Sequence, residues 1–502
     1  MFEELKTNRR LQIIVAVVLV IAIGIGIFVF AQPKKSAVVA TPLVPITLNW
    51  WKPFYGDEVY SKIIEDFEKL PHNKDVKINL VKKEYEESYY KTFLQDQARG
   101  TGPDIFTIKN DDLPAYKEFC TPINNVRDTS GIFIPDTKLL ADYKEKFVNL
   151  AFKETIDRGQ IYAITSYVDN LQLYFNENLL KQAGIVLPPT SWTDLDRQLP
   201  LLNRKEIGGL QFSRNAIAMG TGIIAKPVNG EPEKFNVNRF QDIIPMLLFQ
   251  NGGQMYNKDT KKVLFGQARN QQDVKTNQAT DKDFDETTKN ENPSYQALNF
   301  YNSFANDKSS RYSWAYNSSL NIDAFTQGRL AYMLSYSYFQ NTIKDKNSTL
   351  QYGVAKLPQL DQNNKRTYGF FFMDCASAKL KERSANSRDA ATKRKYQVAK
   401  DFLYYLSTPK VQEKFAVATG LPSAHKDIIA KQQINGNKTS RIFAEGALYA
   451  DNYYKPDVKR AEKIWGDMVY RIQFDNKSIE SSLRVAIKEY SDMIKDGPKV
   501  RG

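Results

Sequence analysis

The strongest constraint on the fold is a regular alternation of strand-like and helix-like segments that begins at residue 46. Residues 46–51, 76–81 and 104–108 are rich in β-branched and aromatic residues, which predicts three strands. Residues 59–70 and 89–98 carry apolar side chains at helical spacing, which predicts a helix between each pair of strands. This order is typical of an α/β fold built on a mainly parallel sheet.

Polar and aromatic residues stand where these predicted strands end. Trp50 and Trp51 close the first strand and begin an aromatic loop, and Asn110 and Asp111 follow the third strand. In parallel sheets, ligands bind at the carboxyl ends of the strands. We therefore expect these four residues to lie at a ligand-binding edge.

The first 45 residues contain one long uncharged segment. Residues 13–31 consist almost entirely of Ile, Val, Leu, Ala, Phe and Gly, and roughly 19 residues at about 1.5 Å each match the thickness of a membrane. Lys6, Arg9 and Arg10 precede the segment, and the positive-inside rule places that end in the cytoplasm. A single-pass anchor in the cell membrane follows.

The division of this region is a cytoplasmic tail at 1–12, a transmembrane anchor at 13–31 and a linker at 32–45. The alternative is a cleaved signal peptide, since residues 29–31 read VFA and resemble a cleavage site. Under either interpretation the rest of the chain lies outside the cytoplasm. No cysteine is near the segment, so lipid attachment there is excluded.

Composition excludes several classes of protein. The net charge of +13 comes from basic residues that are scattered among acidic ones, which indicates a solvated basic surface rather than a nucleic-acid partner. The two histidines are far apart, and no phosphate loop, nucleophile elbow or HExxH motif occurs. We expect no catalytic residues, no metal and no cofactor, and therefore a protein that is not an enzyme.

The two cysteines leave one question open. Cys120 and Cys375 have no CxxC spacing, so they predict neither a thiolate metal site nor a thioredoxin-like motif. A single disulfide and two buried free thiols both remain compatible with the sequence. A polar, charged stretch at 267–292 contains few large apolar groups and predicts a surface insertion or flexible loop.

Several segments, in this order, resemble the extracellular solute-binding proteins of the maltose-binding type, the sugar-binding family of ABC transporters. They are GTGPDI at 100–105, YAI at 162–164, LYFNENLL at 173–180, PPTSW at 188–192, FTQGRLAYM at 325–333 and TPKVQ at 408–412. The resemblance extends over about residues 46–495. Thr165 departs from it, because the family has proline there.

The resemblance implies a two-lobed periplasmic-binding-protein fold in which a hinge closes two α/β lobes over a small ligand. An N-terminal lobe would comprise 46–168 and 374–430, and a C-terminal lobe would comprise 170–372 and 435–497. The partners implied are a small ligand, which we expect to be a sugar, and the permease subunits of an ABC importer.

Further binding candidates follow from the resemblance. Asp169 lies where the family places an acidic hydroxyl acceptor at the hinge, and Asn170 belongs to the same crossing segment. Tyr336, Tyr338 and Trp465 lie in regions where the family has stacking aromatic residues, and Phe371 and Phe372 lie at the second crossing. The full set is Trp50, Trp51, Asn110, Asp111, Asp169, Asn170, Tyr336, Tyr338, Phe371, Phe372 and Trp465. For each aromatic residue, packing in the core is an equally good interpretation.

Two other functions fit the same features. A membrane-anchored sensor or adhesin ectodomain would use the same fold without transport. A binder of non-sugar solutes such as peptides or polyamines would differ only in the lining of its cleft.

Overall fold

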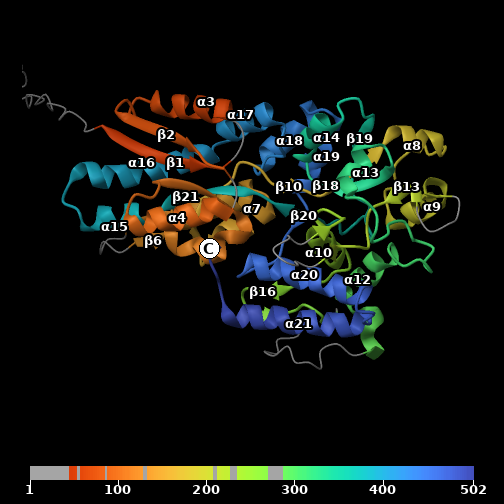
Figure 1. The fold of residues 1–502 in the computed structure, drawn as a ribbon. Helices are drawn as coiled ribbons and strands as arrows, with labels where there is room; N and C mark the ends of the chain where they lie inside the picture. The colour runs from red at the N-terminus through yellow and green to blue at the C-terminus, as the bar shows by residue number, and fades with distance from the viewer. Residues whose placement is uncertain are drawn as a thin grey trace, which may run out of the picture. The chain divides into compact units, whose positions relative to one another are not determined.

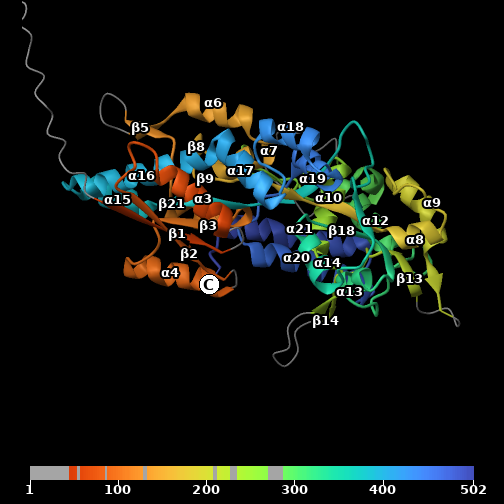
Figure 2. The same ribbon diagram turned by 90° about the horizontal axis from the view of Figure 1, so that it is seen from above.

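The computed structural model describes residues 45–53, 57–84, 87–127, 133–206, 212–225, 234–268 and 286–501. Within these residues, buried apolar side chains form two separate cores, each around its own β-sheet. Figures 1 and 2 show the strands of the two sheets in different parts of the ribbon. Both sheets belong to one compact unit, Ile46–Gly502. We call the part around the first sheet the first lobe and the part around the second sheet the second lobe.

The first lobe contains a sheet with the order β2-β1-β3-β21-β4, and β9 also pairs with β21. β1, β2 and β3 are parallel, whereas β21 runs antiparallel to its neighbours. The strands are β1 (Ile46–Lys52), β2 (Val76–Lys82), β3 (Ile105–Lys109), β4 (Cys120–Thr121), β9 (Ala163–Ile164) and β21 (Phe372–Ser377). β21 comes from a distant part of the sequence, so the first lobe is discontinuous along the chain.

Helices pack around this sheet. They are α3 (Asp57–Glu68), α4 (Glu87–Arg99), α5 (Leu113–Tyr116), α6 (Thr137–Lys146), α7 (Asn149–Thr155), α15 (Ala378–Asn386), α16 (Ala390–Ser407), α17 (Pro409–Thr419) and α18 (Lys426–Asn435), with 3₁₀ helices η1 (Asn110–Asp112) and η2 (Lys117–Phe119). α17 ends at Gly420, whose φ of 70° is the left-handed conformation that terminates helices.

The second lobe contains a sheet with the order β12-β13-β18-β11-β19. Its strands are β11 (Gln172–Asn176), β12 (Arg204–Lys205), β13 (Phe212–Ile217), β18 (Leu330–Ser335) and β19 (Tyr352–Ala355). Every residue of β11 and of β18 is buried, as expected for central strands that are covered on both faces.

The helices of the second lobe include α9, where Ser191 and Asp194 form a capping box at the first turn. The helices are α8 (Glu177–Gln182), α9 (Trp192–Leu202), α10 (Phe240–Gln250), η3 (Glu286–Glu291), α12 (Pro293–Ser303), α13 (Asn321–Thr326), α14 (Phe339–Lys346), α19 (Lys438–Ala447), α20 (Val458–Gln473) and α21 (Ile479–Asp496). Short two-stranded pairs complete the fold: β5 (Asn125–Arg127) with β6 (Phe133–Pro135), β7 (Ile156–Asp157) with β8 (Gln160–Ile161), β14 (Ile223–Ala225) with β15 (Lys234–Phe235), and β16 (Tyr256–Asn257) with β17 (Lys262–Val263).

A third, small sheet joins the lobes. β10 (Asp169–Asn170) pairs antiparallel with β20 (Thr367–Phe370), which pairs parallel with β22 (Ala450–Asp451). We call these three strands the crossing sheet, because the chain runs through them between the two cores. The backbones approach closely here: a Cβ added to Gly369 would lie 2.8 Å from side-chain atoms of both Leu150 and Ala450.

The structure confirms the predicted order of strands and helices in residues 46–108. One local expectation is wrong: Trp50 and Trp51 do not begin a loop, because β1 continues to Lys52 and both indoles are buried. Cys120 and Cys375 are buried free thiols. Most of the predicted insertion, residues 269–285, lies outside the described residues, and so does the predicted anchor at 13–31. Among the described residues, no helix is both long enough and apolar enough to cross a membrane.

Candidate functional site

A cavity of about 730 Å³ lies between the two cores, and its wall takes residues from both lobes. The first lobe contributes Tyr60 from α3, Tyr167, and Phe415 from α17. Its size falls in the range of small-molecule sites, and clefts between lobes are common places for them. We call this cavity the cleft.

Aromatic rings gather on each wall of the cleft. In the first lobe, the rings of Tyr167 and Phe415 are stacked with centroids 6.0 Å apart, and Tyr60 lies 5.6 Å from Phe415. On the side of the second core, Tyr338 and Phe372 flank Phe370, and both contact it edge to face. Phe372 begins β21 of the first lobe, but its side chain packs against the second core. The cleft therefore offers apolar ring surfaces on both sides.

Asp169 stands at the base of the cleft, on β10 of the crossing sheet. Its carboxylate accepts hydrogen bonds from three backbone N–H groups: Asn170 at 2.8 Å, Ser337 at 2.9 Å and Tyr338 at 3.4 Å. Burial raises the pKa of Asp169 to about 6, although these hydrogen bonds oppose the rise. Asp169 therefore holds the turn at Ser337 and Tyr338 against β10.

Four cationic side chains line the cleft, and each is held from behind by a buried carboxylate. The pairs are Lys52–Asp374 at 2.8 Å, Lys109–Asp111 at 2.6 Å, Arg239–Asp242 at 2.7 Å and Arg501–Asp112 at 2.6 Å. Two carboxylates, Asp169 and Glu462, also line the cleft. The wall thus presents more cationic groups than anionic ones, and the balancing carboxylates lie behind it.

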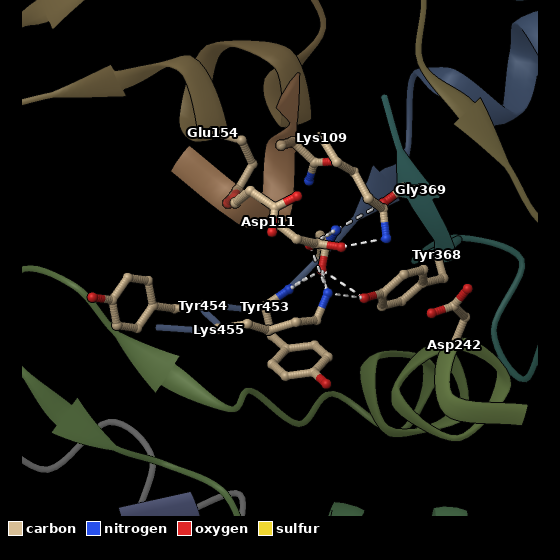
Figure 3. A network of polar contacts seen from close by, with 12 residues as sticks. Lys109, Asp111, Glu154, Asp242, Tyr368, Gly369, Tyr453, Tyr454 and Lys455 are labelled. Atoms are coloured by element: carbon tan, nitrogen blue, oxygen red, sulfur yellow. Dashed lines mark hydrogen bonds and ion pairs between the residues drawn. The ribbon is translucent and has the colours of Figure 1, made fainter. Parts of the chain in front are cut away.

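Asp111 is the centre of a buried polar network between the lobes (Figure 3). Its Oδ1 accepts a hydrogen bond from Lys455 Nζ at 2.6 Å and another from Asn452 Nδ2 at 3.0 Å, while Lys109 Nζ lies 2.6 Å from Oδ2. Lys455 also donates to the Tyr368 hydroxyl at 2.6 Å. Burial alone would raise the pKa of Asp111, but the two ammonium groups hold it well below its usual range.

This network connects three parts of the molecule. Asp111 belongs to η1 of the first lobe, Tyr368 to β20 of the crossing sheet, and Asn452 and Lys455 follow β22 and precede α20 of the second lobe. A change at Asp111 therefore affects the segment that joins β22 of the crossing sheet to α20 of the second lobe.

Three of the predicted site residues line the cleft: Asp169, Tyr338 and Phe372. Trp50 and Trp51 lie in the first core instead. Trp50 is fully buried, donates its Nε1 hydrogen to Asp374 at 3.0 Å and packs edge to face on Phe402. Adjacent residues of β1 point to opposite faces of the sheet, so Trp50 and Trp51 are buried on opposite sides of it. Lys52 shares the face of Trp50, since both side chains bond Asp374, and it lines the cleft because it stands at the end of the strand.

The remaining predicted residues lie one layer behind the wall. Tyr336 stacks on Tyr338, and Trp465 donates to the Tyr453 hydroxyl at 2.7 Å inside the second core. The rest of this group is buried in or beside the crossing sheet: Asn170 on β10, and Asn110, Asp111 and Phe371 next to it. Asn110 and Phe371 are joined by hydrogen bonds of 3.0 Å in both directions.

Several residues that line the cleft were not predicted from the sequence. Lys52 and Lys109 are the last residues of β1 and β3, so the same strand-end argument that pointed to their neighbours could have found them. Arg239 and Arg501 carried no comparable signal, because neither lies beside a predicted strand end.

Comparisons with known proteins agree with this geometry. A family model described as bacterial extracellular solute-binding protein matches residues 62–441. A cyclo/maltodextrin-binding protein in complex with maltotetraose has a TM-score of 0.63 at 15% identity, covering 91% of this chain and 99% of that one. An ABC transporter solute-binding protein from Thermotoga lettingae, bound with α-D-tagatose, has a TM-score of 0.59 at 15% identity, covering 89% and 100%.

A curated relative is similar in part of its sequence. It is named "Putative binding protein" of Brucella abortus (strain 2308), and it is 21% identical over 231 residues, which is 45% of this chain and 45% of that protein. The match thus spans less than half of the relative. The structural likenesses show the two-lobed α/β fold.

Proposed function

This chain belongs to the bacterial extracellular solute-binding proteins, and from that premise we propose that it captures a carbohydrate in the cleft and delivers it to an ABC importer. The observation that carries the proposal is the pairing of aromatic surfaces on opposite walls of one cleft. Sugars present apolar ring faces that stack on aromatic side chains, and hydroxyl groups that need donors and acceptors. Aromatic side chains and hydrogen-bonding groups both line the cleft.

Each wall has a defined part in this function. Tyr60, Tyr167 and Phe415 supply one stacking surface, and Tyr338 and Phe372 supply the other. Cationic groups and Asp169 serve the hydroxyl groups between them. The predicted residues that lie behind the wall position these lining residues; Tyr336, for example, supports Tyr338 from behind.

Closure about the crossing sheet follows from the position of the cleft. A ligand that contacts both walls gains more contacts when the lobes approach, and this difference in affinity favours the closed state. We propose the lobe boundaries stated above, with the hinge at β10, β20 and β22. The relatives of solved structure carry saccharides in complexes of the same fold, which supports the ligand class.

The N-terminal segment completes the proposal. An uncharged helix at 13–31 would tether the protein to the cell membrane with the lobes outside the cytoplasm. Alkaline extraction of membranes tests it: an anchored chain stays with the membrane, whereas a chain with a cleaved signal peptide is released. Protein sequencing of the mature N-terminus distinguishes the two cases.

Thermal unfolding against a ligand panel tests the central part of the proposal. Residues 36–502 are heated with mono- and oligosaccharides, peptides and polyamines. A ligand at 100 times its Kd should stabilise the fold by about 2.7 kcal/mol, which raises Tm by several degrees. A shift with a saccharide supports the proposal, and a shift with peptides or polyamines alone contradicts the carbohydrate assignment.

A further inference from the structure

The charge distribution behind the cleft wall is unequal. Behind the wall, the carboxylate of Asp111 contacts two ammonium groups, Lys109 on Oδ2 and Lys455 on Oδ1, each at 2.6 Å (Figure 3). All three side chains are buried. This group of three carries one net positive charge, and Lys109 is the member that lines the cleft.

Lys109 has hydrogen-bonding capacity left on the cleft side. An ammonium group has three donors, and in the described part of the chain the Lys109 ammonium forms one ion pair, with Asp111 Oδ2. Its ammonium also lies 5.4 Å from the centre of the Phe370 ring at the same wall. A buried cation without a full set of partners is costly, so an anionic ligand group placed here would be stabilised strongly.

A second cation faces the cleft from the other lobe. Arg239 binds Asp242 through Nε and Nη2, and its guanidinium lies 5.4 Å from the centre of the Tyr336 ring. Its Nη1 group contacts no acceptor among the described residues. Arg239 also has a φ of 66°, a conformation that residues other than glycine seldom adopt and that is frequent at binding sites.

Lys109 and Arg239 lie over neighbouring rings, since the Phe370 ring beside Lys109 and the Tyr336 ring beside Arg239 have centroids 4.7 Å apart. Like charges at such sites repel each other. They stand on different lobes, so any closure that brings them nearer increases this repulsion. An anionic group between them would turn the repulsion into two attractions. Glu462 and Asp169 are the acidic groups that share the cleft wall; Glu462 forms no ion pair in the described part of the chain, and the carboxylate of Asp169 is engaged by backbone N–H groups.

We propose that the cleft is specific for an acidic saccharide, whose carboxylate lies between Lys109 of the first lobe and Arg239 of the second lobe. The inference rests on the proposed carbohydrate-binding function and narrows it to one class of sugar. The aromatic side chains of the walls stack on the sugar rings, and the two cations bind the carboxylate. Charge-assisted hydrogen bonds are about twice as strong as neutral ones, so the carboxylate contributes much of the affinity.

Calorimetric titration of the full-length protein in detergent tests this inference. The probes are di- and trisaccharides of galacturonate, glucuronate and mannuronate, each beside its methyl ester, together with maltotriose and inorganic phosphate. The methyl ester keeps the rings and removes the charge. We expect an acidic saccharide to bind about tenfold or more tightly than its own ester, and its affinity to fall as salt is raised.

Variants locate the effect. Arg239→Gln and Lys109→Gln should each weaken binding of the acidic saccharide by about tenfold or more while changing binding of the ester little. Glu462→Gln should tighten it, because a repelling charge is removed from the wall. Arg197→Gln and Lys62→Gln are matched controls, since both side chains are exposed on the surface, and should leave affinity unchanged.

The outcomes separate this inference from the function on which it rests. If neutral saccharides or the esters bind as tightly as the acids, the inference is overturned and the carbohydrate function stands. If no saccharide binds, both are overturned, and binding of phosphate alone at the affinity of the acids overturns the saccharide part. The ester comparison uses the unaltered protein, so it decides even where a variant fails to fold.

Discussion

Residues on the cleft wall and residues behind it should respond differently to mutation. Trp50→Ala removes a fully buried indole, which should lower the free energy of unfolding by about 3–5 kcal/mol. Tyr338 is partly exposed on the wall, so Tyr338→Ala should cost less stability and abolish most of the ligand-induced rise in Tm. Chemical denaturation with and without ligand checks both, and a Trp50→Ala variant of normal stability with lost binding would contradict this division.

Asp169 gives a prediction that depends on pH. Its folded-state pKa of about 6 lies above the usual value of 3.8, so the folded protein binds this proton more tightly than the unfolded chain. The protonated Asp169 side chain makes its full contribution to the free energy of unfolding below pH 4. Up to about 3 kcal/mol of this free energy is lost as the pH rises to 6. Asp169→Asn does not titrate and should therefore gain stability relative to the parent protein across this range. A stability difference that is constant between pH 4 and pH 7 would refute the assignment.

Single residues also show where sequence reasoning succeeded and where it failed. The strand-end argument pointed to the edge of the first sheet that faces the cleft, because Lys52 and Lys109 end strands there. It selected the neighbouring residues Trp50 and Asp111 instead, since the exact register of a strand end is set by tertiary packing. The indole ring of tryptophan is well suited to stack on a sugar, which favoured Trp50 as a candidate. In the structure, Trp50 is buried in the core of the first lobe instead.

At the level of elements, the crossing sheet depends on the network around Asp111. Asp111→Asn leaves Lys109 and Lys455 without a counter-charge and should cost about 3–5 kcal/mol. Lys455→Met leaves Asp111 paired with Lys109 at 2.6 Å, so it should cost clearly less. Urea unfolding of the two variants compares their free energies of unfolding. A larger loss of stability in Lys455→Met than in Asp111→Asn would contradict the claim that one carboxylate balances two ammonium groups.

Elements were more predictable than their contacts. Local patterns predicted the strands and helices of residues 46–108 because hydrophobic spacing sets them directly. The crossing sheet could not be found this way, since β10 and β22 have only two residues each and are defined by pairing with β20. Such short strands have no periodicity of their own.

For the whole molecule, the order of motifs along the chain predicted the two-lobed α/β fold, and the structure and the comparisons confirm it. The composition of the cleft was much less accessible, because its wall is assembled from residues as distant as Lys52, Arg239 and Arg501. Only folding brings these cations to one cavity. The net charge of the sequence therefore predicted a basic surface. The cations that we propose to select the ligand could be identified only from the structure.

The most direct test of the central claim is the distance between the lobes with and without ligand, measured by double electron–electron resonance. Spin labels on Lys69→Cys in the first lobe and Leu187→Cys in the second are suitable, because both positions are exposed while Cys120 and Cys375 are buried free thiols. The saccharide that raises Tm most should shift the distance distribution to a single, narrower population. An unchanged distribution, under conditions where calorimetry shows saturation, would contradict binding by closure of the two lobes.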